Sequence, residues 1–107
     1  MSFLFQTSNI LTGKWQTKEK DKKIEILTKD NVGIATLIWA MEGTRGAGMV
    51  GNEILKDIIY QPKKNSYSCN IVTPRGEMSA VITVYSDSTM FELESDRGKQ
   101  TWIRIKE

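Results

Sequence analysis

Short apolar runs, broken by turn residues, recur along the whole chain. The runs are rich in valine, isoleucine, threonine, tyrosine and tryptophan, and β-branched and aromatic residues favour strands over helices. In the second half of the chain, apolar residues occupy every second position of each run, which is the period of a strand with one buried face. The predicted strands, each given by its range or by its apolar face, are Gly13–Thr17; Lys22–Thr28; Ile34–Met41; Tyr67, Cys69 and Ile71; Met78, Ala80, Ile82 and Val84; Phe91 and Leu93; and Gln100–Ile105.

The segment Glu53–Gln61 fits two patterns. Its isoleucine and leucine residues have helical spacing, and a bulged strand would give the same spacing. Turn residues separate the apolar runs at close to the 8 to 12 residue spacing that is typical of all-β sandwiches and barrels. About eight candidate strands are enough to close an up-and-down barrel without exposed edges. We therefore predict an all-β antiparallel barrel, with residues 1–107 forming a single domain.

The composition is that of an ordinary globular domain and excludes several kinds of chemistry. The chain has 107 residues, of which 39% are hydrophobic and 26% charged, and a formal net charge of +2. It contains no histidine and one cysteine, Cys69, which excludes an internal disulfide, histidine-based metal sites and histidine-dependent triads. Glu92 and Glu94 share one face of a predicted strand, which favours a solvated surface over an acid/base pair. We predict no enzyme activity, no catalytic residues, no cofactor and no bound metal.

The N-terminal residues 1–12 allow two interpretations. The apolar piece Phe3–Phe5 is shorter than the h-region of about 7 to 15 residues that a signal peptide needs. It fits a frayed or disordered N-terminal segment or a strand-capping start, and it also fits the stump of a trimmed signal sequence. No apolar run approaches the roughly 20 residues of a membrane-spanning helix. A secreted or periplasmic location is the expectation, with a cytoplasmic location as the alternative.

One Gly-rich stretch resembles a nucleotide-binding motif. Gly46–Gly51 spells the G-x-G-x-x-G pattern of a dinucleotide-binding turn. The acidic residue expected about 20 positions later is missing, and hairpins follow instead of alternating strands and helices. We therefore interpret the stretch Glu42–Asn52 as a loop, and as a candidate lid over the mouth of the barrel.

Lysine residues near the start raise the question of nucleic-acid binding. They crowd positions 14–23 beside Trp15, and small five-stranded barrels bind single strands through basic grooves and aromatic residues. Glu19 and Asp21 interrupt the lysines, so a solvated strand face is favoured over a basic footprint. An oligonucleotide-binding barrel is the second alternative for the function.

The aromatic residues supply the candidate ligand site. An eight-stranded barrel is either filled by side chains or holds one small ligand, and aromatic side chains with polar tips at its mouth suit a ligand site. The leading prediction is non-catalytic binding of a small apolar or amphipathic ligand, or a role associated with the cell envelope. A filled-core interaction or structural domain is the first alternative, and a monomer or weak homodimer is expected. The candidate ligand-binding residues are Trp39, Met41, Tyr60, Tyr67 and Tyr85.

The two ends of the chain resemble those of lipocalin-like barrels. Gly13-Lys14-Trp15 matches the G-x-W that opens the first strand in that superfamily, and Arg104 stands where a late arginine closes the barrel. The resemblance implies an up-and-down barrel in which Arg104 packs across Trp15. These two residues are therefore predicted to be structural.

A closer resemblance is to a bacterial family of small secreted lipocalin-like domains, domain of unknown function 2147. It covers about Gly13 to Arg104 and includes the G-x-W, the run Gly51–Asp57, a hairpin strand through Tyr67 and the terminal W-x-R. The resemblance implies that Glu53–Gln61 is a strand and that the protein is exported. The family has no settled activity, so the resemblance implies no substrate.

Overall fold

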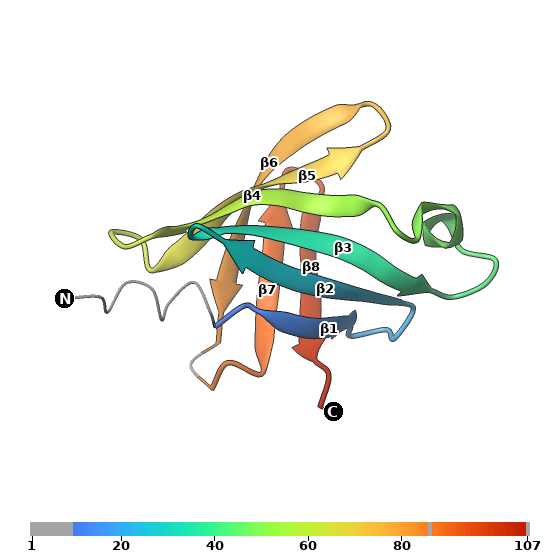
Figure 1. Cartoon of the computed structure of the whole chain (residues 1–107), viewed down its shortest axis with the longest axis horizontal. Coiled ribbons are helices and arrows are strands. Elements are labelled where there is room, and N and C mark those ends of the chain that lie inside the picture. The colour runs from blue at the N-terminus through green and yellow to red at the C-terminus, as the bar shows by residue number, and fades with distance from the viewer. Residues whose placement is uncertain (1–9, 86, 107) are drawn as a thin grey trace.

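The chain forms a closed barrel of eight antiparallel strands, in which each strand pairs with its neighbours in sequence and β1 pairs with β8 (Figure 1). The computed structural model describes residues 10–85 and 87–106. The predicted fold class is thereby confirmed, whereas the interpretations of Phe3–Phe5 lie outside the described residues. The elements are β1 (Gly13–Thr17), β2 (Lys22–Lys29), β3 (Val32–Ala40), the 3₁₀ turn η1 (Arg45–Met49), β4 (Glu53–Gln61), β5 (Ser66–Thr73), β6 (Gly76–Val84), β7 (Met90–Ser95) and β8 (Gly98–Arg104).

Strand number and order rule out the five-stranded alternative. An oligonucleotide-binding barrel has five strands in a Greek-key order, whereas this chain has eight strands in simple up-and-down order. The interpretation as an oligonucleotide-binding fold was therefore wrong. Its support was the chain length and the lysine-rich stretch near Trp15, and neither length nor surface charge determines strand topology.

The ambiguous segment Glu53–Gln61 is a bulged strand. Leu55 and Ile58 are both buried inside the barrel although an odd number of residue steps separates them. The chain accommodates the extra residue at Asp57, whose φ is 53°, and the pairing of β4 with β5 shifts between Lys56 and Ile59. A bulge puts two residues opposite one on the partner strand, which is why this strand has the apolar spacing of a helix.

The hairpin between β2 and β3 is tighter than the sequence suggested. Lys29 pairs with Val32, so the loop consists of Asp30 and Asn31 alone. Both have positive φ, 55° and 66°, as the two-residue turns that fit the twist of a hairpin require. β3 therefore begins at Val32, two residues before the predicted start at Ile34.

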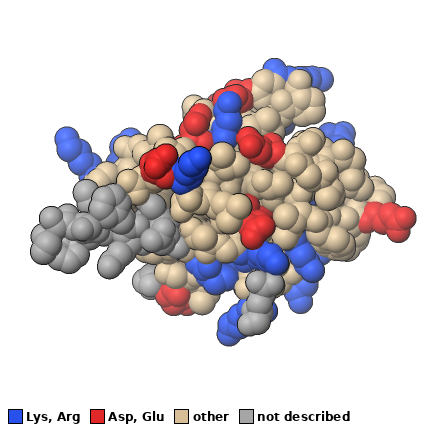
Figure 2. Space-filling model, viewed as in Figure 1, with Lys and Arg blue, Asp and Glu red and all other residues tan. Residues whose placement is uncertain are grey.

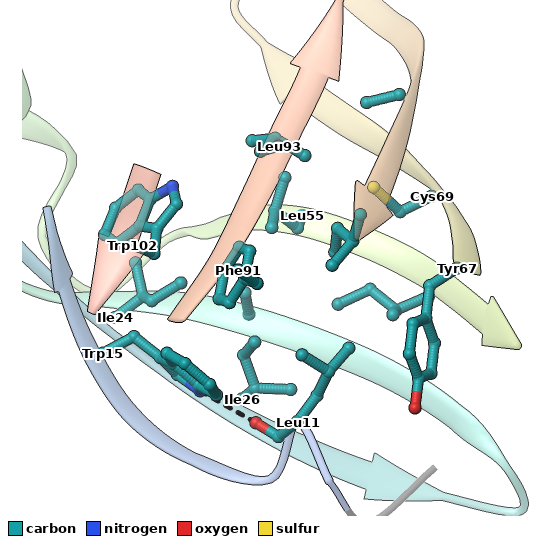
Figure 3. Close-up of a cluster of buried hydrophobic side chains, with 14 of the residues drawn as sticks. Leu11, Trp15, Ile24, Ile26, Leu55, Tyr67, Cys69, Phe91, Leu93 and Trp102 are labelled. Carbon is teal, nitrogen blue, oxygen red and sulfur yellow. Dashed lines mark hydrogen bonds between the residues drawn. The ribbon is translucent and has the colours of Figure 1, made fainter. Parts of the chain in front are cut away.

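Large side chains fill one end of the barrel. This closed end is the one where β1 begins and β8 finishes (Figure 3). Trp15 meets the edge of Phe91 with ring centroids 4.7 Å apart, and Phe91 stacks with Trp102 at 6.2 Å. Leu11 is fully buried against them, and its carbonyl accepts a hydrogen bond from Trp15 Nε1 at 2.9 Å. Leu11 belongs to the residues 1–12 for which disorder was considered, and it is instead part of the core.

Burial of the Cys69 thiol and the Tyr67 phenol predicts a loss of stability at alkaline pH. Desolvation raises the pKa of the Cys69 thiol to about 12, and desolvation with a smaller contribution from Tyr60 raises the pKa of Tyr67 to about 12. Between about pH 9 and pH 12 the unfolded chain gives up these protons while the folded chain keeps them, so rising pH favours unfolding. We expect the free energy of unfolding to fall by about 1.4 kcal/mol per pH unit for one such group.

Denaturant titrations at several alkaline pH values would measure this loss. The variant Cys69→Ala keeps Tyr67 and is expected to lose stability less steeply with pH than the wild type. Identical slopes for the two proteins would show that the Cys69 thiol ionises equally in the folded and unfolded states.

Candidate functional site

A cavity of about 790 Å³ occupies the open end of the barrel, opposite the Trp15 end. The connections between β1 and β2, β3 and β4, β5 and β6, and β7 and β8 surround this end. Its walls are largely apolar, and the volume falls within the range of about 300–1,000 Å³ that small-molecule sites have. The apolar lining residues are Leu37, Met49, Ile54, Ile71, Val72, Pro74, Met78, Leu93 and Trp102.

The cavity exists because the β5–β6 hairpin diverges from the rest of the barrel (Figure 1). β6 pairs with β5 along Gly76 to Ile82, but it pairs with β7 only from Val81 to Val84. The first half of β6 therefore has no register partner on β7. Met78 lies in that half and lines the cavity together with Leu93 of β7.

The Gly-rich loop lies at the cavity and is tied to the barrel. Arg45, Gly46 and Met49 of η1 line the cavity. Backbone hydrogen bonds run from Gly51 N to Leu37 O at 2.7 Å and from Leu37 N to Asn52 O at 3.0 Å, so the loop re-enters the sheet as an extension of β3 and β4. The segment predicted as a lid therefore forms a wall of the mouth. The G-x-G-x-x-G run leads into a strand and not into the helix that follows a dinucleotide-binding turn, which agrees with the interpretation that it is not a nucleotide-binding motif.

Positive charge is concentrated around the open end. Five of the described residues that line the cavity are cationic and one, Glu19, is acidic, which makes a local charge of +4 in a chain of net charge +2. The rest of the chain is therefore net acidic. The five cations are Lys18, Lys22, Arg45, Arg97 and Lys99.

Trp39 and Met41 lie outside the barrel and do not line the mouth cavity. They are 40% and 45% exposed. Leu37 and Trp39 have the same parity, so strict alternation predicts that both point inward. β3 carries an extra residue between them, because Ile24 pairs with Leu37 and Lys23 with Trp39. This bulge turns the Trp39 ring outward, where the Lys23 ammonium lies 5.1 Å from its centre.

The three tyrosines are also away from the mouth. Tyr60 and Tyr67 pair across β4 and β5 with ring centroids 5.2 Å apart, near the β4–β5 turn, and the Tyr60 hydroxyl donates to Asn65 Oδ1 at 3.0 Å. Tyr85 is exposed and donates to Glu92 Oε2 at 3.2 Å, and this carboxylate raises the pKa of the Tyr85 hydroxyl. The five candidate ligand residues therefore do not assemble into one site.

Trp15 and Arg104 do meet at the closed end. The Arg104 guanidinium carbon lies 4.2 Å from the centre of the Trp15 ring, a distance at which a cation is attracted to the face of a ring. Arg104 Nε donates to Ser88 O at 2.9 Å, Nη1 donates to Thr12 O at 3.0 Å, and Nη2 donates to Ile10 O. One side chain thus ties together the strand that begins the barrel, the strand that ends it and the β6–β7 connection.

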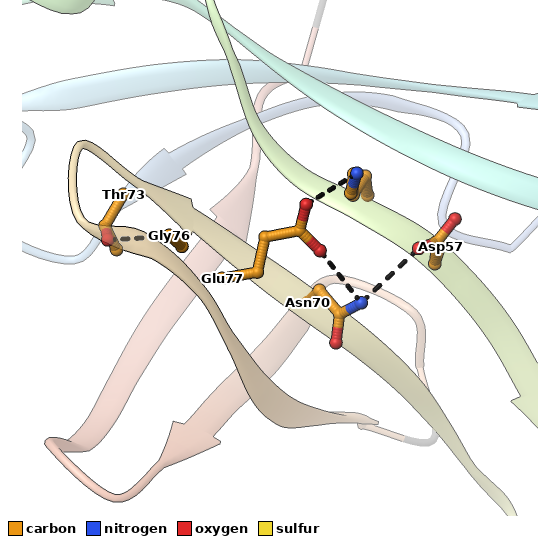
Figure 4. A network of polar contacts seen from close by, with 6 residues as sticks. Asp57, Asn70, Thr73, Gly76 and Glu77 are labelled. Atoms are coloured by element: carbon orange, nitrogen blue, oxygen red, sulfur yellow. Dashed lines mark hydrogen bonds and ion pairs between the residues drawn. The ribbon is translucent and has the colours of Figure 1, made fainter.

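A second hollow, of about 570 Å³, lies on the outer face of β5 and β6 and is lined by Asp57, Asn70 and Glu94. The Asn70 amide donates to both Asp57 Oδ2 and Glu77 Oε1 at 3.3 Å, and Lys56 Nζ pairs with Glu77 Oε2 at 2.6 Å (Figure 4). These contacts join β4, β5 and β6 across their outer faces. We interpret this network as a surface brace, because its polar groups already satisfy one another.

The described part of the chain gives no indication of a metal site, a membrane-spanning helix or a broad charged surface. Within residues 10–85 and 87–106, no group of three or more histidine, cysteine, aspartate or glutamate side chains is placed to hold a metal ion. None of the helical structure described there is long and apolar enough to cross a membrane. On the face seen in Figure 2, acidic side chains lie among the lysine and arginine side chains, so no broad patch of one sign covers it.

Comparisons with known proteins support the fold. No protein-family model matches the sequence, and no curated protein matches it. A solved structure described as "Protein HP1028 from the human pathogen Helicobacter pylori belongs to the lipocalin family" superposes with a TM-score of 0.67, over 91% of this chain and 84% of that chain, at 18% sequence identity. The closer resemblance to domain of unknown function 2147 stays a prediction. At this low identity the likeness shows that the chain has the fold of a lipocalin-family structure.

Proposed function

We propose that the protein binds a small apolar or amphipathic molecule in the mouth cavity and does no chemistry on it. The observation that carries the proposal is the cavity of about 790 Å³ with apolar walls at one end of a barrel whose other end is filled. Burying apolar ligand surface there would contribute about 25 cal/mol for each Å² removed from water. The closed end supplies the rigid core, so a ligand enters a cavity that is already formed.

A neutral fluorescent probe, N-phenyl-1-naphthylamine, would test the proposal. We expect its fluorescence to rise on binding to the wild type. Met78→Glu places a carboxylate among the apolar walls of the cavity, and we expect it to weaken probe binding at least tenfold, because burying an unpaired charge or polar group is costly. Circular dichroism would check that the variant is folded.

The matched control is Leu27→Glu. Leu27 is also on a strand and is 59% exposed on the outer face of the barrel, so this variant adds the same charge away from the cavity. We expect the control to bind the probe like the wild type. Equal weakening in both variants would place the probe elsewhere on the surface and contradict the proposed site.

A wild-type protein that binds no probe would favour the other candidate, a domain that acts through its outer surface. The exposed apolar side chains Leu27, Ile34 and Trp39 on β2 and β3 support that candidate. Sedimentation of the purified protein would test the expected monomer or weak homodimer. Fractionation of cells that express it from its own promoter would test the proposed export.

A further inference from the structure

We infer that the mouth cavity selects amphiphiles with an anionic headgroup, which Lys22, Arg45 and Gln100 bind at the rim while the apolar tail enters the barrel. This inference rests on the proposed function and specifies the class of ligand. The three residues come from β2, η1 and β8, and all of them line the cavity. A single-chain carboxylate or phosphate ester has the required chemistry, since both headgroups accept charge-assisted hydrogen bonds.

Lys22 belongs to the inward face of β2. Ile24 and Ile26 are fully buried, and Lys22 is two residues before Ile24, on the same side of the strand. Its stem packs against η1, because a Cβ built on Gly46 would lie 3.2 Å from Lys22 Cε. The apolar stem is thus held half-buried at the mouth, an arrangement that lets a lysine keep its ammonium in water. Arg45 is the residue before Gly46, so the same contact brings its backbone to the rim beside Lys22.

Gln100 supplies an uncharged hydrogen-bond donor for the headgroup. It is two residues before the buried Trp102 and therefore shares the inward face of β8. Trp102 Nε1 donates to Gln100 Oε1 at 3.0 Å, which fixes the orientation of the side-chain amide. The amide nitrogen of Gln100 carries two donors, and within the described residues it makes no hydrogen bond. It is therefore available to an acceptor at the cavity.

Among the described residues, no carboxylate forms an ion pair with the five cavity-lining cations, although Glu19 also lines the cavity. The ion pair of Lys56 with Glu77 lies on the outer face and involves none of these five cations. The neighbouring Asp21 carboxylate accepts a hydrogen bond from the Thr17 hydroxyl at 2.6 Å and does not line the cavity. Unpaired positive charge around an apolar cavity raises the local concentration of anions and orients an amphiphile with its headgroup outward.

Displacement of N-phenyl-1-naphthylamine by three ligands with the same tail would test the inference. These are dodecanoate and dodecyl phosphate, used below their micelle concentrations, and dodecanol, used below its solubility limit. We expect both anions to displace the probe at concentrations about tenfold lower than dodecanol, which corresponds to 1.4 kcal/mol. We also expect this preference to shrink as ionic strength rises, because salt screens exposed charges. A difference between the two anions would indicate which headgroup fits.

The variant Lys22→Gln/Arg45→Gln is expected to lose the preference for the anions while it still binds the neutral probe. The control, Lys63→Gln/Lys64→Gln, removes the same charge from the β4–β5 turn at the other end of the barrel and is expected to keep the preference. Equal displacement by dodecanol and the anions in the wild type would overturn the inference and leave the proposed function standing. A preference that survives in the mouth variant, or disappears in both variants, would also overturn it. Absence of probe binding to the wild type would instead overturn the proposed function itself.

Discussion

Replacement of Trp15 by alanine is expected to lower the free energy of unfolding by about 3–5 kcal/mol, the range for removing a large aromatic side chain from a core. The Trp15 side chain is fully buried. Its loss would leave a void against Phe91, remove the hydrogen bond to Leu11 O at 2.9 Å and take the ring from beneath Arg104. Urea titration followed by far-ultraviolet circular dichroism would measure the change without relying on tryptophan fluorescence.

Trp39→Ala is the matched control for this experiment. It removes the same side chain from the outer face, where Trp39 is 40% exposed and contacts Lys23. We expect it to cost about 1 kcal/mol or less. If the two variants lost equal stability, the closed end would not be the dominant core of the barrel.

Replacement of Arg104 by alanine is expected to lower the free energy of unfolding by about 2–4 kcal/mol. The guanidinium donates to three backbone carbonyls, on Ile10, Thr12 and Ser88, and lies over Trp15. Burial lowers the pKa of Arg104 from its ordinary value, but arginine stays protonated in proteins. The variant would therefore lose a charged donor and leave carbonyl groups at the closed end without their partner.

Two further variants separate geometry from charge. Arg104→Lys keeps a cation but cannot reproduce the fork of donors, so we expect it to recover only part of the stability. Arg97→Ala removes a cation from the β7–β8 turn at the open end and is expected to change stability by about 0.5 kcal/mol or less. We expect Arg104→Ala to bind N-phenyl-1-naphthylamine normally in its folded state, because its side chain lies at the end opposite the cavity. Loss of probe binding in folded Arg104→Ala would mean that the two ends are coupled.

Local sequence patterns determined the strands of this protein, whereas the pairing of Trp15 with Arg104 at the closed end was expected from the resemblance to lipocalin-like barrels. Alternation placed Ile24, Ile82 and Phe91 on buried faces, and they are fully buried. Turn residues such as Asp30 and Asn31 marked the hairpins, since these residue types tolerate positive φ. These signals are readable because strand period and turn chemistry depend on neighbouring residues alone.

Only the tertiary structure decided where a ligand can enter. The bulge that turns Trp39 outward and the bulge at Asp57 have no local signature, and each shifts the inward parity of the residues that follow. The hollow end also depends on the divergence of the β5–β6 hairpin from β7, which is a property of strand pairing. Lys22, Arg45 and Gln100 are distant in the sequence, and barrel closure brings them to one rim. The sequence showed that these residues were polar, and the pairing of distant strands decided that they share a site.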